Sequence, residues 1–358
     1  MRLGAHPETL IEWLALRLNL APKPLADTHL AFLFARIIMA ATNFGLFEAL
    51  GDGGRTAEEV AAACKTDGQV TSKVLDALLA LGYLEFRNGR YQLNGLSRKW
   101  LLADSPDTLV HKLAFQKIEW RWTEGIDTSL QDGASRDMHR SLSPEEWSSY
   151  QWAMRDVATT PAKEVARRVR LPSNATALLD IGGSHGFYSV ALCRRYPTLA
   201  ATILDLPEAI PTAAEILTRE HMGARVRHVP GNALTSDLGH GIYDAVLIAL
   251  LVHHFTDEQN RELTAKAERA LKPGGVFMIV DAARIESPRD VRRPNRRASA
   301  VLDVYFALTS HSGTWSVSQM QGWQRAAGLQ AKRPIWLRTM PGAVVLPATR
   351  LEAARPPT

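Results

Sequence analysis

The sequence has few of the features expected of an exported protein. Only two of its 358 residues are cysteine, Cys64 and Cys193, and they fall in different halves of the chain within helix-like segments. We expect free thiols in a reducing compartment instead of a disulfide framework. An acid and a proline stand near the N-terminus, where a secretory signal would have its apolar run. These features predict a cytoplasmic protein.

Long uninterrupted apolar runs are also missing. The apolar stretch at residues 245–252 is stopped by His253 and His254, and no stretch approaches the roughly 20 apolar residues of a membrane span. The formal net charge is only +5, and much of the basic excess sits at residues 284–297. Since 46% of residues are hydrophobic and 22% charged, the composition is that of an ordinary globular protein. We therefore expect neither a membrane nor a nucleic-acid partner.

Apolar side chains recur at helical spacing over residues 30–50, among them Phe34, Ile38 and Phe44. They fall on more than one face of the predicted helix, which a single small core cannot cover. A second subunit would cover them, so the sequence predicts a homodimer formed through this region.

The next segment carries the signals of three helices and a hairpin. Thr56 and Glu59 form a capping box, Asp67 caps the following helix, and Asn88-Gly89 is a strong two-residue hairpin turn. Three helices and a two-stranded wing make a winged-helix unit. A DNA-reading helix would present several basic side chains, whereas the helix before the wing offers only Lys73. We therefore predict a structural, dimer-forming module instead of a DNA-binding one.

Residues 97–169 have a helical pattern rich in tryptophan, and from about residue 175 short apolar runs alternate with helices, as in a parallel β-sheet. Three parts are predicted. They are a winged-helix dimerisation domain at 1–105, a helical connector and substrate-pocket wall at 106–170, and an α/β ligand-binding domain at 171–350.

The first strand of the α/β domain runs into a loop of small residues that opens a helix. Such a turn lets a ligand approach the backbone at the positive end of the helix. The spacing does not fit the dinucleotide fingerprint, because Ser184 and Phe187 occupy its second and third glycine positions. Asp180 precedes the loop, and a carboxylate there favours a ligand with an ammonium or sulfonium charge.

Two later strands end in residues suited to an adenosine group. Asp205, followed by Leu206, ends the second strand, where a carboxylate can accept hydrogen bonds from both ribose hydroxyls. Asn232 and Ala233 follow the third strand and are candidate contacts to the adenine.

These motifs occur together in one order: Leu-Asp-Ile-Gly-Gly-Ser-His-Gly from 179, Leu-Asp-Leu-Pro from 204, Gly-Asn-Ala from 231, Val-His-His-Phe-Thr-Asp-Glu from 252 and Leu-Lys-Pro-Gly-Gly from 271. In that order and spacing the chain resembles the class I S-adenosylmethionine-dependent methyltransferases. Over residues 30–329 it is most similar to the small-molecule O-methyltransferases related to caffeate and hydroxyneurosporene methyltransferases.

The resemblance implies an α/β, Rossmann-like catalytic domain with a mostly parallel seven-stranded sheet, preceded by an all-helical, winged-helix dimerisation domain. It implies S-adenosylmethionine as cofactor, S-adenosylhomocysteine as product, no metal, a small-molecule acceptor and a role in secondary metabolism. The implied cofactor contacts are Asp180, Gly182, Gly183, Ser184, Gly186, Asp205, Leu206, Asn232 and Ala233.

Methyl transfer to a hydroxyl requires alignment of the nucleophile with the methyl group and removal of a proton. A histidine, with an ordinary pKa of about 6.5, can take that proton as the bond forms. By resemblance the catalytic histidine is His253. The two acids that orient it in the family correspond to Asp281, shorter than the usual Glu, and Gln319, which cannot ionise. O-methylation with His253 as base is the first hypothesis, and proximity-driven N- or C-methylation stays open.

The acceptor-binding side chains are predicted on two helices. Met154 and Trp152 lie in a segment that resembles the family's cover over the substrate cleft, and core packing is an equally good interpretation. Tyr305, with its neighbour Phe306, is a weaker candidate. The arginines at 289, 292, 293, 296 and 297 are typical of a solvated loop, or form a lid that recognises a carboxylate or a carrier-bound acceptor.

Two further alternatives stay open. One is a winged-helix regulator that senses S-adenosylmethionine without catalysis. The other is a different reaction on the same scaffold, which the loss of an acid at Gln319 allows.

Overall fold

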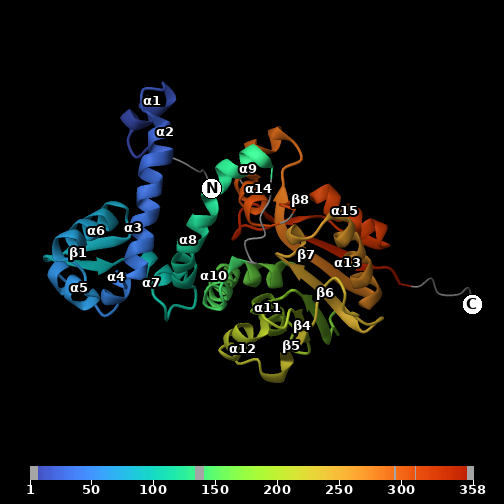
Figure 1. Cartoon of the computed structure of the whole chain (residues 1–358). Helices are drawn as coiled ribbons and strands as arrows, with labels where there is room; N and C mark the ends of the chain where they lie inside the picture. The colour runs from blue at the N-terminus through green and yellow to red at the C-terminus, as the bar shows by residue number, and fades with distance from the viewer. Residues whose placement is uncertain (1–6, 134–140, 294–295, 311, 353–358) are drawn as a thin grey trace, which may run out of the picture. The chain divides into compact units, whose positions relative to one another are not determined.

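A computed structural model of the chain describes residues 7–133, 141–293, 296–310 and 312–352. The chain divides between Glu119 and Trp120 into two compact units. Figure 1 labels many of their helices and strands.

The first unit is mostly helical. Its helices are α1 (Leu10–Arg17), α2 (Lys23–Leu25), η1 (Ala26–Leu30), α3 (Ala31–Asn43), α4 (Leu46–Ala49), α5 (Ala57–Cys64), α6 (Gly68–Ala80), α7 (Gly95–Trp100) and most of α8 (Val110–Thr123). Its two strands are β1 (Leu84–Arg87) and β2 (Arg90–Leu93). Its core gathers side chains of α3 to α6 and both strands, with Phe47, Leu50, Leu75 and Leu78 fully buried.

The predicted winged-helix signals are confirmed. The Thr56 and Glu59 side chains form a capping box at the start of α5, and the Asp67 side chain accepts from the backbone N–H of Val70 at the start of α6. Strands β1 and β2 pair antiparallel across Asn88-Gly89, whose backbones both have positive φ. Those angles are the ones that a type I′ hairpin turn requires.

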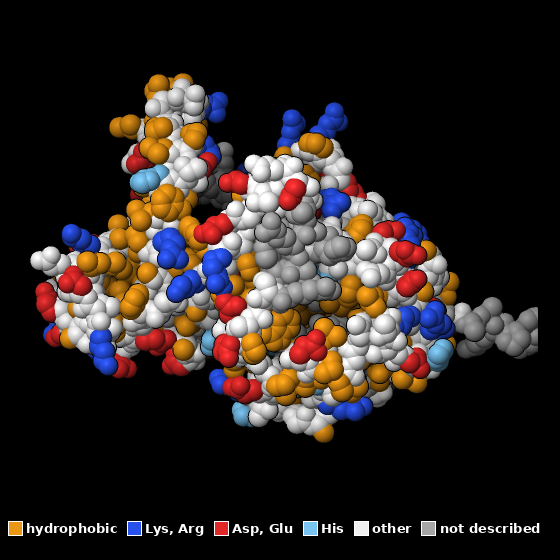
Figure 2. Space-filling model, in the orientation of Figure 1, with side chains coloured by type: hydrophobic (Ala, Val, Ile, Leu, Met, Phe, Trp, Pro, Cys, Tyr) orange, Lys and Arg blue, Asp and Glu red, His pale blue; other side chains and the backbone are white. Residues whose placement is uncertain are grey.

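α2, η1 and α3 join into one continuous helix, Lys23–Asn43, which carries much exposed apolar surface (Figures 1 and 2). Its 21 residues reach a mean hydropathy of 1.4 in their most apolar window, of which 11% is buried. By length and composition alone this helix would pass for a membrane span. The sequence prediction considered only uninterrupted apolar runs. It therefore missed this helix, in which polar residues interrupt the apolar ones. Phe32, Leu33 and Phe34 are among its exposed apolar side chains.

The second unit contains a sheet with helices on both sides. Its strands are β3 (Ala177–Ile181), β4 (Ala200–Asp205), β5 (Val226–Pro230), β6 (Tyr243–Ala249), β7 (Leu271–Arg284), β8 (Trp315–Ser316), β9 (Leu329–Ala331), β10 (Ile335–Trp336) and β11 (Ala343–Arg350). Seven strands follow one path, in the order β10-β11-β7-β6-β3-β4-β5, and the short strands β8 and β9 pair with β7 and β11. Strands β7, β6, β3, β4 and β5 run parallel to one another. β11 pairs antiparallel with β7, and β10 pairs antiparallel with β11.

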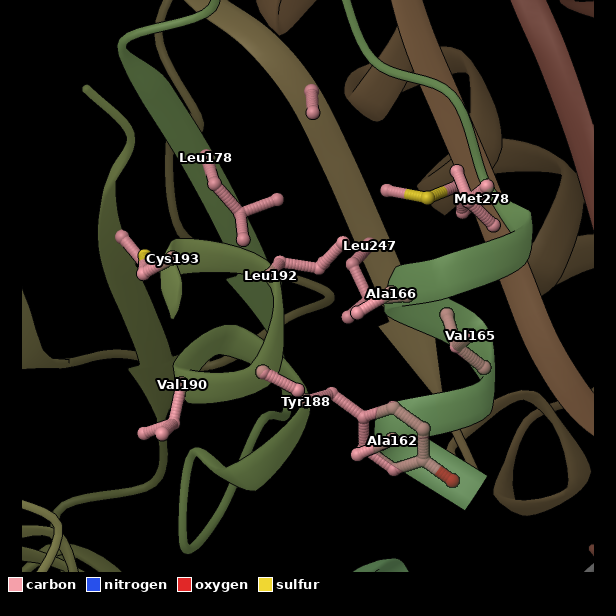
Figure 3. Close-up of a cluster of buried hydrophobic side chains, with 14 of the residues drawn as sticks. Ala162, Val165, Ala166, Leu178, Tyr188, Val190, Leu192, Cys193, Leu247 and Met278 are labelled. Atoms are coloured by element: carbon pink, nitrogen blue, oxygen red, sulfur yellow. The ribbon is translucent and has the colours of Figure 1, made fainter. Parts of the chain in front are cut away.

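The helices of this unit are α9 (Ile126–Asp132), α10 (Pro144–Arg168), α11 (Phe187–Arg195), α12 (Ile210–Thr218), η3 (Gly223–Arg225), η4 (Val252–His254), α13 (Asp257–Ala270), η5 (Pro288–Arg292), α14 (Arg297–Thr309) and α15 (Val317–Ala326). Side chains of α10, α11 and α12 cover one face of the sheet, and those of α13 and α15 cover the other. Figure 3 shows the first of these two cores. Both layers leave the carboxyl ends of β3, β4, β6 and β7 at one edge of the sheet, where ligands bind in parallel α/β folds.

Candidate active site

The loop after β3 contains three glycines at which a Cβ would meet a neighbouring side chain. Gly182 has φ +67°, and a Cβ there would lie 2.7 Å from the Leu251 side chain. Gly186 has φ +72°, and its Cβ would lie 2.5 Å from Ile203. A Cβ on Gly183 would lie 2.5 Å from the Asp180 carboxyl carbon. The glycines therefore let the loop approach both the buried acid at the end of β3 and the segment that carries His253.

Asp180 is buried at the base of this loop. One carboxylate oxygen, Oδ2, accepts a hydrogen bond of 2.7 Å from the Ser189 hydroxyl on α11. The other, Oδ1, has no hydrogen-bond partner among the described residues. Burial raises the pKa of Asp180 to about 7, an effect that the Ser189 hydrogen bond opposes and the charge of Asp205 reinforces. A buried carboxylate oxygen without a donor is the arrangement that a cationic ligand group completes.

Ser184 ties the loop to three neighbouring elements. Its N–H donates to Asp205 Oδ2 at 2.7 Å, its hydroxyl donates to Gln151 Oε1 at 2.6 Å, and its carbonyl oxygen lies 2.8 Å from His228 Nε2. These contacts hold Ser184 at φ +47°, an uncommon angle for a residue with a side chain. Gln151 also donates to the carbonyl of Ala209. Neither Gln151 nor His228 was predicted, because their sequence positions show no motif.

Asp205, Leu206, Asn232 and Ala233 lie where adjacent strands end. Asp205 Oδ1 accepts from the N–H of Leu206, whose side chain is 38% exposed. Asn232 Oδ1 accepts from the N–H of Leu234, which closes a local turn. The Lys266 ammonium on α13 donates to the carbonyls of Ala233 and Leu234 and so fixes this turn against α13.

A tight turn after β6 positions His253. Leu250 has φ +53°, and its N–H still bonds to the carbonyl of Val280 on β7. The carbonyl of Val252 then accepts from the Asn260 side-chain amide at 2.9 Å and from the Trp315 indole N–H at 3.0 Å. The short helix η4 that carries His253 is thus held from two sides.

His253 and Asp281 form a buried pair, as predicted. Nδ1 of the imidazole lies 2.9 Å from Oδ1 and 3.1 Å from Oδ2 of Asp281, and the two residues are 3% and 1% exposed. A carboxylate can only accept, so Nδ1 carries the hydrogen. In the neutral ring Nε2 then has the free lone pair, which is the form that a general base requires.

Aromatic side chains stack around the imidazole. The rings of Phe306 and His254 have their centroids 4.1 and 4.3 Å from that of His253. Tyr305 touches Phe306 edge to face at 5.4 Å. Of the two candidates on α14, Phe306 therefore contacts the His253 ring, and Tyr305 contacts Phe306. Adjacent helix residues point about 100° apart, so the sequence alone did not decide between them.

The structure contradicts the predicted role of Gln319. Its side chain is exposed, and its carbonyl oxygen accepts at 3.0 Å from the N–H of Ser316, as part of the capping box that begins α15. His253, in contrast, is buried beside Asp281. An amide oxygen committed to the helix start does not orient the imidazole, so Asp281 alone does so among the described side chains.

The structure also separates Trp152 from Met154. Residues two apart on a helix point about 200° from each other. The Trp152 ring lies 4.3 Å from the Arg219 guanidinium, at the end of α12. Trp152 thus packs against α12, as in the core-packing interpretation, and a clamp of one acceptor between the two side chains stays a prediction. Met154 is half-buried on the opposite side of α10.

The arginine cluster before α14 is partly used by the fold. Arg296 pairs with Asp290 and stacks on Trp336, and Arg297 donates to the carbonyl of Val291. Arg289, Arg292 and Arg293 are exposed. This supports the solvated loop for three of the five arginines only, and the lid hypothesis is not tested by the structure.

The fold and the pair of sites at the carboxyl edge define a class I methyltransferase. A family model described as the O-methyltransferase domain matches residues 125–325, and one described as the O-methyltransferase dimerisation domain matches residues 26–103. The chain therefore belongs to the O-methyltransferase family and is an S-adenosylmethionine-dependent methyltransferase.

Individual relatives agree with this assignment. The chain is 27% identical over 333 residues to a 3-hydroxy-5-methyl-1-naphthoate 3-O-methyltransferase of Streptomyces sahachiroi, covering 90% of this chain and 93% of the relative. It is 29% identical over 258 residues to an N,N-dimethyltransferase of Streptomyces rimosus, covering 69% and 74%. Human N-acetylserotonin methyltransferase, solved in complex with S-adenosylmethionine, has the same fold, with a TM-score of 0.77 at 18% identity over 98% of this chain and all of that one.

Proposed function

We propose that this enzyme methylates a hydroxyl group on a small aromatic acceptor, with His253 as the general base. The observation that carries the proposal is the buried His253–Asp281 hydrogen bond, which leaves Nε2 of the imidazole as the proton acceptor. The position just beyond β6, at the ligand-binding edge of the sheet, supports the same role.

The bound cofactor supplies an electrophilic methyl group on a sulfonium. With the cofactor bound, the acceptor oxygen would bond to the methyl carbon as the sulfur–carbon bond breaks, and that electron pair would stay on the sulfur. The acceptor proton moves to Nε2 of His253, and Asp281 stabilises the resulting imidazolium by its negative charge. The imidazolium then returns the proton to solvent.

The cofactor is held by the residues around the glycine loop. Asp180 faces the amino-acid part, Gly182, Gly183, Ser184 and Gly186 let it approach the backbone, Asp205 accepts from the ribose, and Leu206, Asn232 and Ala233 contact the adenine. The orphaned Oδ1 of Asp180 and the space kept free of Cβ atoms support this fit. No group of three described His, Cys, Asp or Glu residues is arranged to hold a metal ion.

The acceptor site is lined by Phe306, Tyr305 and Met154. Aromatic rings and a thioether favour a flat, apolar acceptor through stacking and sulfur–ring contacts. The first relative is named for methylation of a hydroxynaphthoate, an acceptor of this kind.

We also propose a cytoplasmic homodimer, in which the exposed apolar surface of α3 packs against a second copy. The match of residues 26–103 to a dimerisation domain and the exposed Phe32, Leu33 and Phe34 support it. Within each chain we keep the three predicted parts, with residues 106–170 connecting the dimerisation and catalytic domains.

The test is product analysis. Purified enzyme is incubated with methyl-labelled S-adenosylmethionine and matched hydroxy-, amino- and unsubstituted aromatic compounds, and the products are identified by mass spectrometry. The proposal predicts a methyl ether on the hydroxy compounds. Methylation confined to the amines would support the proximity-driven alternative, for which the N,N-dimethyltransferase relative is a precedent. Cofactor binding without any methylated product would favour the non-catalytic sensor.

A further inference from the structure

Tyr188, in the first turn of α11, has a buried hydroxyl without a hydrogen-bond partner. The residue is 5% exposed, and its ring lies beside Ala162 of α10 in the core that Figure 3 shows. Its oxygen is buried and makes no hydrogen bond to any described residue. Buried hydroxyl groups are nearly always hydrogen-bonded, so this one requires a partner that the described residues do not supply.

The hydroxyl belongs to the same end of the sheet as the cofactor loop. Tyr188 follows Gly186 by two residues, and its neighbour Ser189 donates to Asp180. Burial raises the pKa of Tyr188, and the charges of Asp281 and Asp180 raise it further. The phenol therefore lies within electrostatic reach of both the acid below the cofactor loop and the acid behind His253.

Two buried polar atoms, one before and one after the cofactor loop, thus have no partner among the described residues, and they are complementary. When Asp180 is ionised, its Oδ1 is an acceptor and cannot donate, whereas the Tyr188 hydroxyl can donate a hydrogen bond. An amino-acid zwitterion presents a donor ammonium and an acceptor carboxylate on one carbon. The start of α11 adds the positive end of a nine-residue helix, which favours a carboxylate.

We propose that Tyr188 binds the α-carboxylate of the amino-acid part of S-adenosylmethionine, while Asp180 Oδ1 accepts from its α-ammonium. This inference rests on the proposed placement of the cofactor over the glycine loop. It assigns the hydroxyl a binding role toward the cofactor only, with no part in proton transfer from the acceptor.

The proposal is tested by calorimetry with three ligands that differ only in the amino-acid part. S-adenosylhomocysteine carries both charged groups, its decarboxylated analogue keeps the amine, and 5′-methylthioadenosine has neither. In Tyr188→Phe we expect the affinity for S-adenosylhomocysteine to fall about tenfold, as for loss of a hydrogen bond to a charged group. Affinity for the other two ligands should stay within twofold.

Two controls separate this from a general loss of structure. Tyr243→Phe removes a partly buried hydroxyl at the start of β6, at the opposite edge of the sheet, and should leave all three affinities unchanged. The melting temperature of Tyr188→Phe should not fall, because the hydroxyl that it removes is unpaired.

An unchanged affinity of Tyr188→Phe for S-adenosylhomocysteine would overturn the proposal, as would an equal loss for all three ligands, which would indicate a structural role. If the unmodified protein binds none of the three, the proposed cofactor site itself is wrong. That outcome is distinct from failure of the tyrosine assignment.

Discussion

Nδ1 of His253 and Oδ1 of Asp281 lie 2.9 Å apart, and both residues are almost fully shielded from water. The carboxylate also accepts at 2.7 Å from the N–H of Ala282, so its orientation is fixed from its own strand. Because the pair is buried, the negative charge acts on the imidazole with little screening by solvent.

Asp281→Asn should lower kcat by about 10², because the amide oxygen can still accept from Nδ1 but no longer stabilises an imidazolium by charge. Cofactor affinity should stay within twofold. Asp244→Asn is a matched control, since Asp244 bonds to Thr176 and Lys272 at the start of β6. That variant should lose stability while the folded enzyme keeps its kcat. Equal kcat in Asp281→Asn and the unmodified enzyme would remove Asp281 from the mechanism.

Gln319→Glu should leave kcat and the pH–rate profile within twofold of the unmodified enzyme. The side chain is exposed and caps α15, and glutamate fills the same capping-box position. Steady-state kinetics across pH 6 to 9 provides the check. A marked shift in the profile would mean that this side chain reaches the imidazole during turnover.

Binding of S-adenosylhomocysteine should release a proton at pH 6. Burial raises the pKa of Asp180 in the ligand-free protein to about 7, and an ammonium beside it would lower that pKa again. Affinity should therefore rise by up to about tenfold per pH unit from pH 5 to 7 and then level off. Calorimetry in buffers of different ionisation enthalpy measures the proton, and Asp180→Asn should abolish its release. Affinity independent of pH over this range in the unmodified protein would argue against an ionised Asp180 in the complex.

The same shift affects folding in the opposite direction. The folded, ligand-free protein retains a proton on Asp180 between about pH 4 and 7 that the unfolded chain has lost. This group's contribution to stability therefore decreases as pH rises through that window.

Leu30→Glu combined with Phe34→Glu should convert the dimer into a monomer at micromolar concentration, because these two exposed side chains lie four residues apart on one face of the continuous helix Lys23–Asn43. Light scattering gives the mass. Phe86→Glu, at an equally exposed phenylalanine on the hairpin, should remain dimeric. A monomeric unmodified protein, or a dimer that survives the double change, would contradict the proposed interface.

The elements that the sequence predicted best are those with local causes. The capping box at Thr56, the hairpin turn at Asn88-Gly89 and the acid before the glycine loop each depend on residues within a few positions of one another. The parallel part of the sheet followed from the alternation of short apolar runs with helices, and its order of strands was not predicted.

The errors arose where a side chain had two possible environments. Gln319 satisfies a helix start instead of the imidazole, and only the position of Ser316 three residues earlier signals this. Trp152 and Met154 are a different case, because the sequence left core packing open and a continuous helix sends residues two apart to opposite sides. Gln151, His228 and Tyr188 had no signal at all, since their partners are 20 or more residues away or outside the chain.

The central claim, that His253 is the general base of an O-methyltransferase, is tested most directly by single-turnover methyl transfer to the best hydroxy-aromatic acceptor, with His253→Ala compared to His254→Ala. We expect the rate in His253→Ala to fall by about 10² to 10⁴ with S-adenosylhomocysteine affinity within twofold, and His254→Ala to lose much less. Near-normal methyl transfer by His253→Ala would contradict the account and assign the reaction to proximity alone.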